Sequence, residues 1–258
     1  MDNYRSISPF TNVLPNDLFS GFIGRRKELA EIKAVFERGI RGLIILGIGG
    51  IGKTSLAWMA ARQNETLFPG GIFSTSASWS ESLPQLMNRI LPSHSASPLL
   101  LVINDAEIFE EEEAAYLDDQ FHRSPNLRLI LTTRKDLPLL PSFYRVRLEG
   151  LNKEEFQELL QLRNAVAHNQ LDDRLAERLF QLAGGNALFA NLAAYAIKSG
   201  IVKSWRELFQ YVRSYSTPGI VEPDGRPLTR ESVEYNRIIL ALWELPDNPQ
   251  YLVILERG

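Results

Sequence analysis

The residues with the clearest chemical potential lie in one glycine-rich stretch, residues 47–54, which reads GIGGIGKT. The stretch fits the pattern G-x-x-x-x-G-K-[ST], and it stands between a short apolar run and a helix-forming run, as that pattern requires. Glycines let successive backbone N–H groups point inward toward phosphates, and the following helix N-terminus adds partial positive charge there. The lysine would reach the β- and γ-phosphates of a nucleotide, and the hydroxyl after it can bind Mg²⁺. The sequence therefore predicts a phosphate-binding loop (P-loop) formed by Gly47, Gly49, Gly50, Ile51, Gly52, Lys53, Thr54 and Ser55.

A second polar site is expected where the apolar run at residues 98–103 ends, on a strand neighbouring the one that leads into the P-loop. Many P-loop ATPases place an aspartate first at such a position, to hold Mg²⁺, and an acid second, to orient the attacking water. Here the two positions are Asn104 and Asp105, and an amide carries no charge to help hold the ion. With Thr54, these two residues are the candidate metal ligands, and weakened Mg²⁺ binding or hydrolysis is expected. Two alternatives stay open: Asp105 reaches the Mg²⁺ shell while Glu107 or no residue polarises the water, or Asn104 only caps the strand.

A third candidate is Arg134, which follows two threonines at the end of the apolar run LILTT. Ligands of open α/β sheets bind at the carboxyl ends of the strands. Arg134 is therefore placed to reach the γ-phosphate and report its presence, and a surface salt bridge is its alternative role. Together with Lys53 and Asp105, it completes the predicted set of catalytic residues.

The elements that would position these residues alternate between strand and helix. Short apolar runs near residues 42, 72, 99, 127 and 144 read as strands, and amphipathic segments between them read as helices. This alternation predicts an α/β fold, a P-loop NTPase parallel sheet covered by helices on both faces. After residue 150 the strands stop and four helical segments follow, which predicts a small all-helical domain. The expected divisions are an N-terminal arm (1–20), a nucleotide-binding domain (21–150), a helical lid domain (151–213), and a linker with a C-terminal helix (214–258), the possible start of a further domain.

The composition restricts the class of protein. A net charge of -3 makes a general nucleic-acid binder unlikely, although a local basic patch is not excluded. No cysteine is present, so no disulfide, cysteine-ligated zinc or thiol chemistry is expected. No apolar run has the roughly 20 residues needed to span a bilayer, and the N-terminus lacks the pattern of a signal peptide. We therefore expect a cytoplasmic protein that makes no contact with membranes.

Taken in order, these motifs resemble those of the STAND class of signalling ATPases, specifically the NB-ARC type of plant resistance proteins and apoptosome-forming proteins. The resemblance covers roughly residues 21–200 through FIGRRKEL, GIGGIGKTSLA, LLLVIND, LRLILTTR, LEGLNKEEFQELL and LAGGNALFANLAAYAI. It implies ATP or ADP with Mg²⁺ as the cofactor. It also implies that the backbone of Phe22 and Ile23 meets the adenine, that Arg25 approaches the nucleotide, and that Arg134 is the sensor.

Two departures from that family weaken the resemblance. Its proline in the last motif is replaced by Ala187, which suits the first position of a helix but loses the ring that would cover the base. No winged-helix domain with a terminal histidine is recognisable after residue 200. The chain is therefore either a minimal member or a piece of a longer protein.

Three functions follow from these motifs. The first is a nucleotide-dependent defence or signalling switch, in which slow ATP hydrolysis controls closure of the helical domain. Self-association in the ATP state or an effector outside this chain would carry the signal. The second is an AAA+-like mechanical ATPase, such as a DNA-loading or remodelling factor. The third is a scaffold that holds a nucleotide without hydrolysing it.

Overall fold

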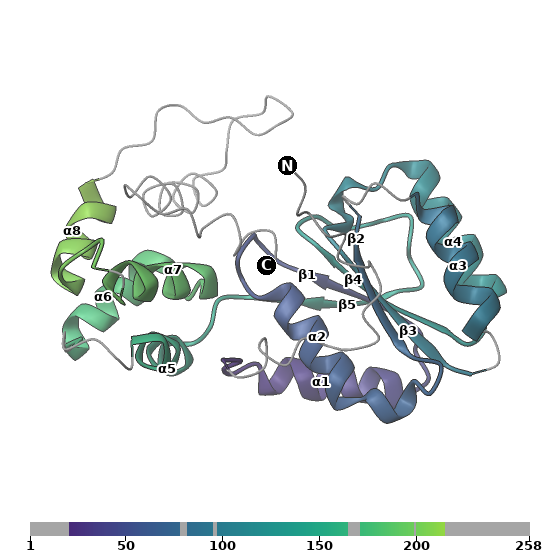
Figure 1. Ribbon diagram of the computed structural model, residues 1–258, viewed down its shortest axis with the longest axis horizontal. Coiled ribbons are helices and arrows are strands. Elements are labelled where there is room, and N and C mark those ends of the chain that lie inside the picture. Colours follow the sequence, from purple (N-terminus) through teal and green to yellow (C-terminus); the bar gives the residue numbers. More distant parts are fainter. Residues whose placement is uncertain (1–20, 78–81, 95–96, 165–170, 199, 215–258) are drawn as a thin grey trace, which may run out of the picture. The chain divides into compact units, whose positions relative to one another are not determined.

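The computed structural model describes residues 21–77, 82–94, 97–164, 171–198 and 200–214 (Figure 1). These residues form two compact units. The first contains the described residues up to Leu148 except Gly50–Gly52, and the second contains Gly50–Gly52 and the described residues from Glu149 onward. The predicted N-terminal arm and the predicted C-terminal helix lie outside the described residues.

A five-stranded parallel sheet forms the centre of the first unit. Its strands are β1 (Gly42–Leu46), β2 (Ile72–Ser76), β3 (Leu99–Asn104), β4 (Leu127–Thr133) and β5 (Tyr144–Arg147). Their order is β2-β3-β4-β1-β5, so the three most apolar strands are central. Because all strands run in the same direction, their carboxyl ends meet along one edge, where Ser76 pairs with Asn104 and Leu46 with Thr133.

Helices cover both faces of this sheet (Figure 1). They are α1 (Arg26–Glu37), α2 (Lys53–Gln63), α3 (Leu83–His94) and α4 (Glu111–Arg123). Alternate residues of a strand point to opposite faces, and both sets are buried here, as in the neighbours Ile44 and Ile45. The expected α/β fold with a parallel sheet and helices on both faces is confirmed.

The strand order corrects one prediction. The strand that ends in Asn104 is not a neighbour of the P-loop strand, because β4 lies between β3 and β1. Apolar patterning shows that a strand is buried on both faces but does not rank the strands across the sheet. As a consequence, the end of β4, with Thr132 and Thr133, stands between the P-loop and the polar residues that follow β3.

Four helices form the second unit: α5 (Lys153–Asn164), α6 (Asp173–Ala183), α7 (Ala187–Lys198) and α8 (Trp205–Ser214). A capping box opens α5, since the Asn152 side chain accepts from Glu155 N–H (2.9 Å) and the Glu155 side chain accepts from Asn152 N–H (3.1 Å). The α6 helix ends at a glycine pair in the left-handed region, Gly184 and Gly185. A Cβ at Gly185 would stand 2.2 Å from the Leu151 carbonyl oxygen, so two backbones meet there at a distance only glycine allows.

Two further observations concern surface and membrane. The acidic run Glu110–Glu113 is exposed at the start of α4, and Glu110 and Glu113 build a capping box there. Within the described parts of the chain, no helix is long and apolar enough to cross a membrane.

Candidate nucleotide-binding site

The P-loop connects β1 directly to α2, whose first residue is Lys53. Its backbone depends on glycine at two positions, because Gly50 (φ 68°) and Gly52 (φ 103°) lie in the region that residues with a Cβ rarely adopt. The amide of Gly47 donates to the Thr133 carbonyl (3.2 Å), which ties the start of the loop to the end of β4. The loop is therefore anchored to the strand that carries the threonine pair.

Lys53 is a buried cation, with only 8% of its surface exposed. Its Nζ donates to the carbonyl oxygen of Ile48 across the loop (3.0 Å). Burial lowers the pKa of Lys53 below 10.5; the charge of Glu107 opposes this shift, that of Arg134 adds to it, and that of Asp105 opposes it. A buried ammonium is costly unless an anion accompanies it. The donor set at this loop therefore fits the phosphates of a nucleotide.

Asn104 links the ends of three strands. Its Oδ1 accepts a hydrogen bond from the Thr132 hydroxyl (3.1 Å), and its Nδ2 donates to the Thr75 carbonyl (3.4 Å). These contacts join β3 to β4 and to β2, which is the strand-end role named above as an alternative for this residue. The amide oxygen is already engaged by a hydroxyl, and an amide is a weaker ligand for Mg²⁺ than a carboxylate.

Asp105 has an unusual backbone conformation, with φ 57° in the left-handed region. Its Oδ2 accepts from the Ser76 hydroxyl (3.1 Å), and its backbone N–H donates to the Thr132 hydroxyl (3.4 Å). A non-glycine residue in this region costs free energy, and such residues gather at functional sites. Both ends of Asp105 are thus held by hydroxyl groups from the flanking strands.

Arg134 and Glu107 make two contacts with each other. The Nε of Arg134 lies 3.0 Å from Glu107 Oε1, and the Arg134 backbone N–H donates to Glu107 Oε2 (3.2 Å). The arginine side chain is 64% exposed and the glutamate 17%. Arg134 therefore forms the salt bridge named as its alternative role, while its exposure leaves the guanidinium free to turn. Of the charges around Lys53, that of Glu107 raises the pKa of the lysine the most.

The remaining predicted ligands occupy three places. Thr54 is half-buried and Ser55 exposed in the first turn of α2, while Phe22 and Ile23 precede α1. Arg25 is 5% exposed, has φ 59° and pairs with Glu28 (3.2 Å). Ala187 belongs to the second unit, at the first position of α7.

The structure brings together Lys53, Asp105 and Arg134 in the first unit, where the charges of Asp105 and Arg134 both act on Lys53. It adds Thr132 and Ser76, which were not among the predicted ligands, and it places Glu107, named above only as a residue to polarise the water, against Arg134. A polar residue at the carboxyl end of a strand, in β2 for Ser76 and in β4 for Thr132, is the signal that identifies these two. Within the described ranges, no group of three or more His, Cys, Asp or Glu side chains could hold a metal ion. A Mg²⁺ ion at Thr54 and Asp105 would therefore rely on phosphate oxygens and water for its other ligands, as Mg²⁺ commonly does.

Comparison with known proteins identifies the fold. The chain is similar to the solved structure of RuvB from Thermotoga maritima, described as a Holliday junction branch migration motor, with 19% sequence identity and a TM-score of 0.51 over 87% of this chain and 70% of RuvB. A single-residue variant of the same protein gives 19% identity and a TM-score of 0.53 over 86% and 70%. No protein-family model matches the sequence, and no curated protein matches it significantly. At this identity the likeness establishes the P-loop NTPase fold and gives no specific support to the STAND or NB-ARC assignment.

Proposed function

We propose that the chain binds ATP with Mg²⁺ and hydrolyses it as a mechanical ATPase of the AAA+ kind. The observation that carries the proposal is the buried Lys53 ammonium at the P-loop, in the field of Asp105, Glu107 and Arg134. The likeness to a branch migration motor supports the mechanical ATPase over the switch. It also makes a nucleic-acid partner more plausible than composition suggested, and self-association of the chain belongs to the same proposal.

In this proposal each functional residue of the first unit has a separate role. Lys53 exchanges its bond to the Ile48 carbonyl for bonds to the β- and γ-phosphates. Thr54 and Asp105 would hold Mg²⁺, which would supply charge that stabilises the transferred phosphoryl group. Arg134 leaves Glu107 for the γ-phosphate, so the Glu107 carboxylate is then available to accept a hydrogen bond from the attacking water. ADP would not draw Arg134 away, and this difference reports which nucleotide is bound.

The proposal extends to the other predicted contacts. Phe22, Ile23 and Arg25 would surround the base and ribose, and Ala187 at the start of α7 would contact the base from the helical lid domain, residues 151–213. Without the proline ring, that last contact is weaker and nucleotide exchange faster. A cytoplasmic location is part of the same proposal.

A slow switch of the STAND type is the second candidate function. It is favoured by Asn104, because a neutral amide in place of an aspartate weakens the hold on Mg²⁺ and slows turnover. The exposed Arg134 also suits a sensor. In such a protein the nucleotide shifts an equilibrium only as far as it binds one state more tightly.

One experiment separates the two. Purified full chain is denatured and any released nucleotide is identified by mass spectrometry, and steady-state ATP turnover is then measured with and without Mg²⁺ and DNA. A motor releases its ADP and turns over many times, with DNA stimulating the rate. A switch retains about one ADP per chain and shows almost no turnover. A chain that neither retains nor binds any adenine nucleotide would overturn both functions.

A further inference from the structure

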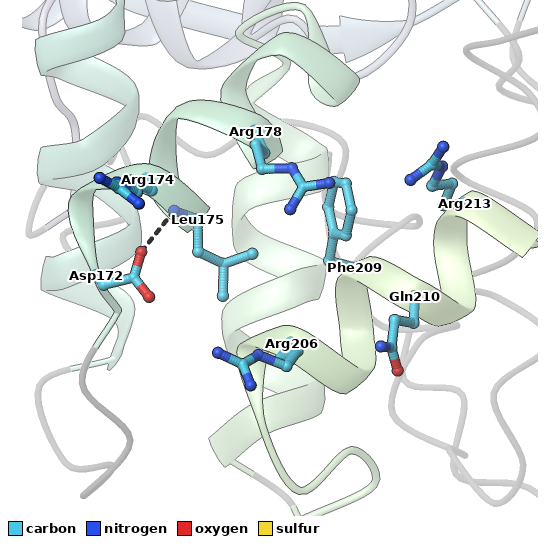
Figure 2. Close-up of a pocket in the computed structure, with 8 residues that line it drawn as sticks. All are labelled: Asp172, Arg174, Leu175, Arg178, Arg206, Phe209, Gln210 and Arg213. Carbon is cyan, nitrogen blue, oxygen red and sulfur yellow. Dashed lines mark hydrogen bonds between the residues drawn. The ribbon is translucent and has the colours of Figure 1, made fainter.

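A groove with strongly basic walls lies in the second unit, between α6 and α8 (Figure 2). Its volume is about 470 Å³. The residues that line it are Asp172, Arg174, Leu175, Arg178, Arg206, Phe209, Gln210 and Arg213. Four arginines against one aspartate give the groove a surplus of positive charge, although the whole chain has a net charge of -3.

The single carboxylate of the groove has a structural task of its own. Asp172 is the N-cap of α6, and its Oδ1 accepts a hydrogen bond from the backbone N–H of Leu175 (2.7 Å), a contact drawn in Figure 2. Within the described parts of the chain, no carboxylate forms an ion pair with Arg174, Arg178 or Arg206. These three guanidinium groups are exposed to solvent. The positive charge of the groove is therefore not neutralised by its walls.

The basic side chains stand on rigid supports. On α6, Arg174 and Arg178 are four residues apart, which places them about 6 Å apart on one face. On α8, Arg206 and Arg213 are seven residues apart, or about 10 Å. Beneath them, the apolar side chains of both helices are fully buried: Leu179, Leu208 and Val212.

One arginine is also stacked on an aromatic ring. The guanidinium of Arg178 lies over the ring of Phe209, 4.5 Å from its centroid, and the ring is half-buried (Figure 2). Both residues line the groove, so the pair presents a guanidinium and an aromatic ring side by side there. Flat guanidinium faces and aromatic rings are the surfaces on which unpaired nucleobases stack.

We propose that this groove binds the sugar–phosphate backbone of a nucleic acid. Guanidinium groups bind phosphate oxygens through paired hydrogen bonds, and a row of cations some 10 Å long matches a run of phosphates better than a single anion. The Arg178–Phe209 stack gives a base a place to lie, whereas an acidic peptide would make no use of it. The inference goes beyond the proposed ATPase, because it requires no nucleotide at the P-loop.

The test measures fluorescence anisotropy of the full chain with labelled oligothymidylate and with a labelled duplex, over a range of NaCl concentrations. If Arg174, Arg178 and Arg206 each contact one phosphate, the slope of log K against log salt is about −2 for the single strand and about −3 for the duplex. Arg206→Ala and Arg174→Ala each weaken binding by about three- to tenfold and reduce the slope by about one. Arg178→Lys keeps the slope but weakens binding of the single strand, because an ammonium does not stack.

Two controls make the result specific. Arg123→Ala removes an exposed arginine from the first unit with the same change in net charge, and it leaves binding unaltered. Lys53→Ala strongly weakens ATP binding yet leaves nucleic-acid binding in place, so failure of the ATPase proposal is distinguishable from failure of this one. Three results would overturn the inference: no binding of either oligonucleotide, equal weakening by Arg123→Ala, or competition by polyglutamate as strong as that by unlabelled oligonucleotide.

Discussion

Two polar regions of this chain differ in how their charges are held. At the carboxyl edge of the sheet, every predicted catalytic residue has a partner from a neighbouring segment: Lys53 with Ile48, Asp105 with Ser76, and Arg134 with Glu107. In the arginine groove of the helical unit, three arginines form no ion pair with any carboxylate of the described residues. The charged groups of the first region are held by partners within the protein, whereas most of those in the second face solvent.

The difference has a physical consequence. Charges such as that of Lys53 lie in a region of low dielectric constant, where a partner is worth several kcal/mol and salt screens poorly. Exposed guanidinium groups interact through water, where each pair is worth up to about 1 kcal/mol and salt screens strongly. The sheet edge therefore suits chemistry on a bound nucleotide, and the groove suits reversible, salt-dependent association. The predictions below test that division.

Lys53→Ala has the largest expected effect. Losing the buried ammonium removes the main contact to the phosphates, and ATP affinity should fall by a factor of about 100 to 1,000, in line with the loss of one partner of a buried charge pair. The free energy of unfolding without nucleotide should stay the same or rise, because a desolvated cation is removed. Isothermal titration calorimetry and urea unfolding measure the two quantities. Unchanged ATP affinity would contradict the P-loop assignment.

The pH dependence of the unmodified chain provides the control. The pKa of Lys53 is lowered by burial. Above that lowered pKa and below 10.5, the folded chain binds fewer protons than the unfolded chain, so the free energy of unfolding should rise with pH. ATP affinity should fall over the same pH range, because only the ammonium pairs with phosphate. The Ala variant should lack both trends, and a native chain whose affinity is flat across this range would contradict the argument.

Asn104→Asp has an intermediate expected effect. Its side chain would keep the bond from the Thr132 hydroxyl but would bring a carboxylate oxygen toward the Thr75 carbonyl, in place of an N–H donor. Without nucleotide we expect a loss of about 1 kcal/mol, or about 2–4 °C in Tm for a domain of this size. With Mg²⁺ and ATP, the loss should be reversed and hydrolysis should increase. Asn104→Ala is the matched control, and an equal drop in Tm with and without Mg²⁺-ATP would show that Asn104 has only the strand-end role.

Much of the fold was predictable from the sequence, because the strong local signals agree with the global fold. The P-loop pattern stood between an apolar run and a helix former, and β1 and α2 occupy those places. The apolar run before Asn104 had the length and composition of a buried parallel strand, and β3 is buried throughout up to that residue. The sequence also contains a capping-box pattern, Asn152 followed by Glu155, ahead of the first helix of the second unit, and the structure contains both of its hydrogen bonds.

The rest depended on contacts between segments far apart in sequence. The sequence contained Thr75, Thr132 and Asn104 but gave no sign that one amide joins three strand ends. The position of β4 between β3 and β1 follows from how crossovers pack, which no single strand's composition encodes. The sequence did not predict the basic groove, because its arginines are spread over two helices. The net charge of the chain combines them with acidic residues elsewhere, so it does not reveal a local excess of positive charge.

Arg134→Ala has the smallest expected effect on stability and the clearest functional one. The Arg134 side chain is 64% exposed, and its backbone N–H keeps its bond to Glu107 in the variant, so the free energy of unfolding should change by less than about 0.5 kcal/mol. Preference for ATP over ADP should fall by about three- to tenfold, because only the γ-phosphate competes with Glu107 for the guanidinium. Calorimetric titration with both nucleotides measures this ratio. Arg123→Ala, which breaks a more exposed pair with Asp119, should leave the ratio unaltered. If Arg134→Ala weakens ATP and ADP equally, the arginine acts on both nucleotides alike, and its contact with Glu107 is then a surface salt bridge of the same kind as that of Arg123.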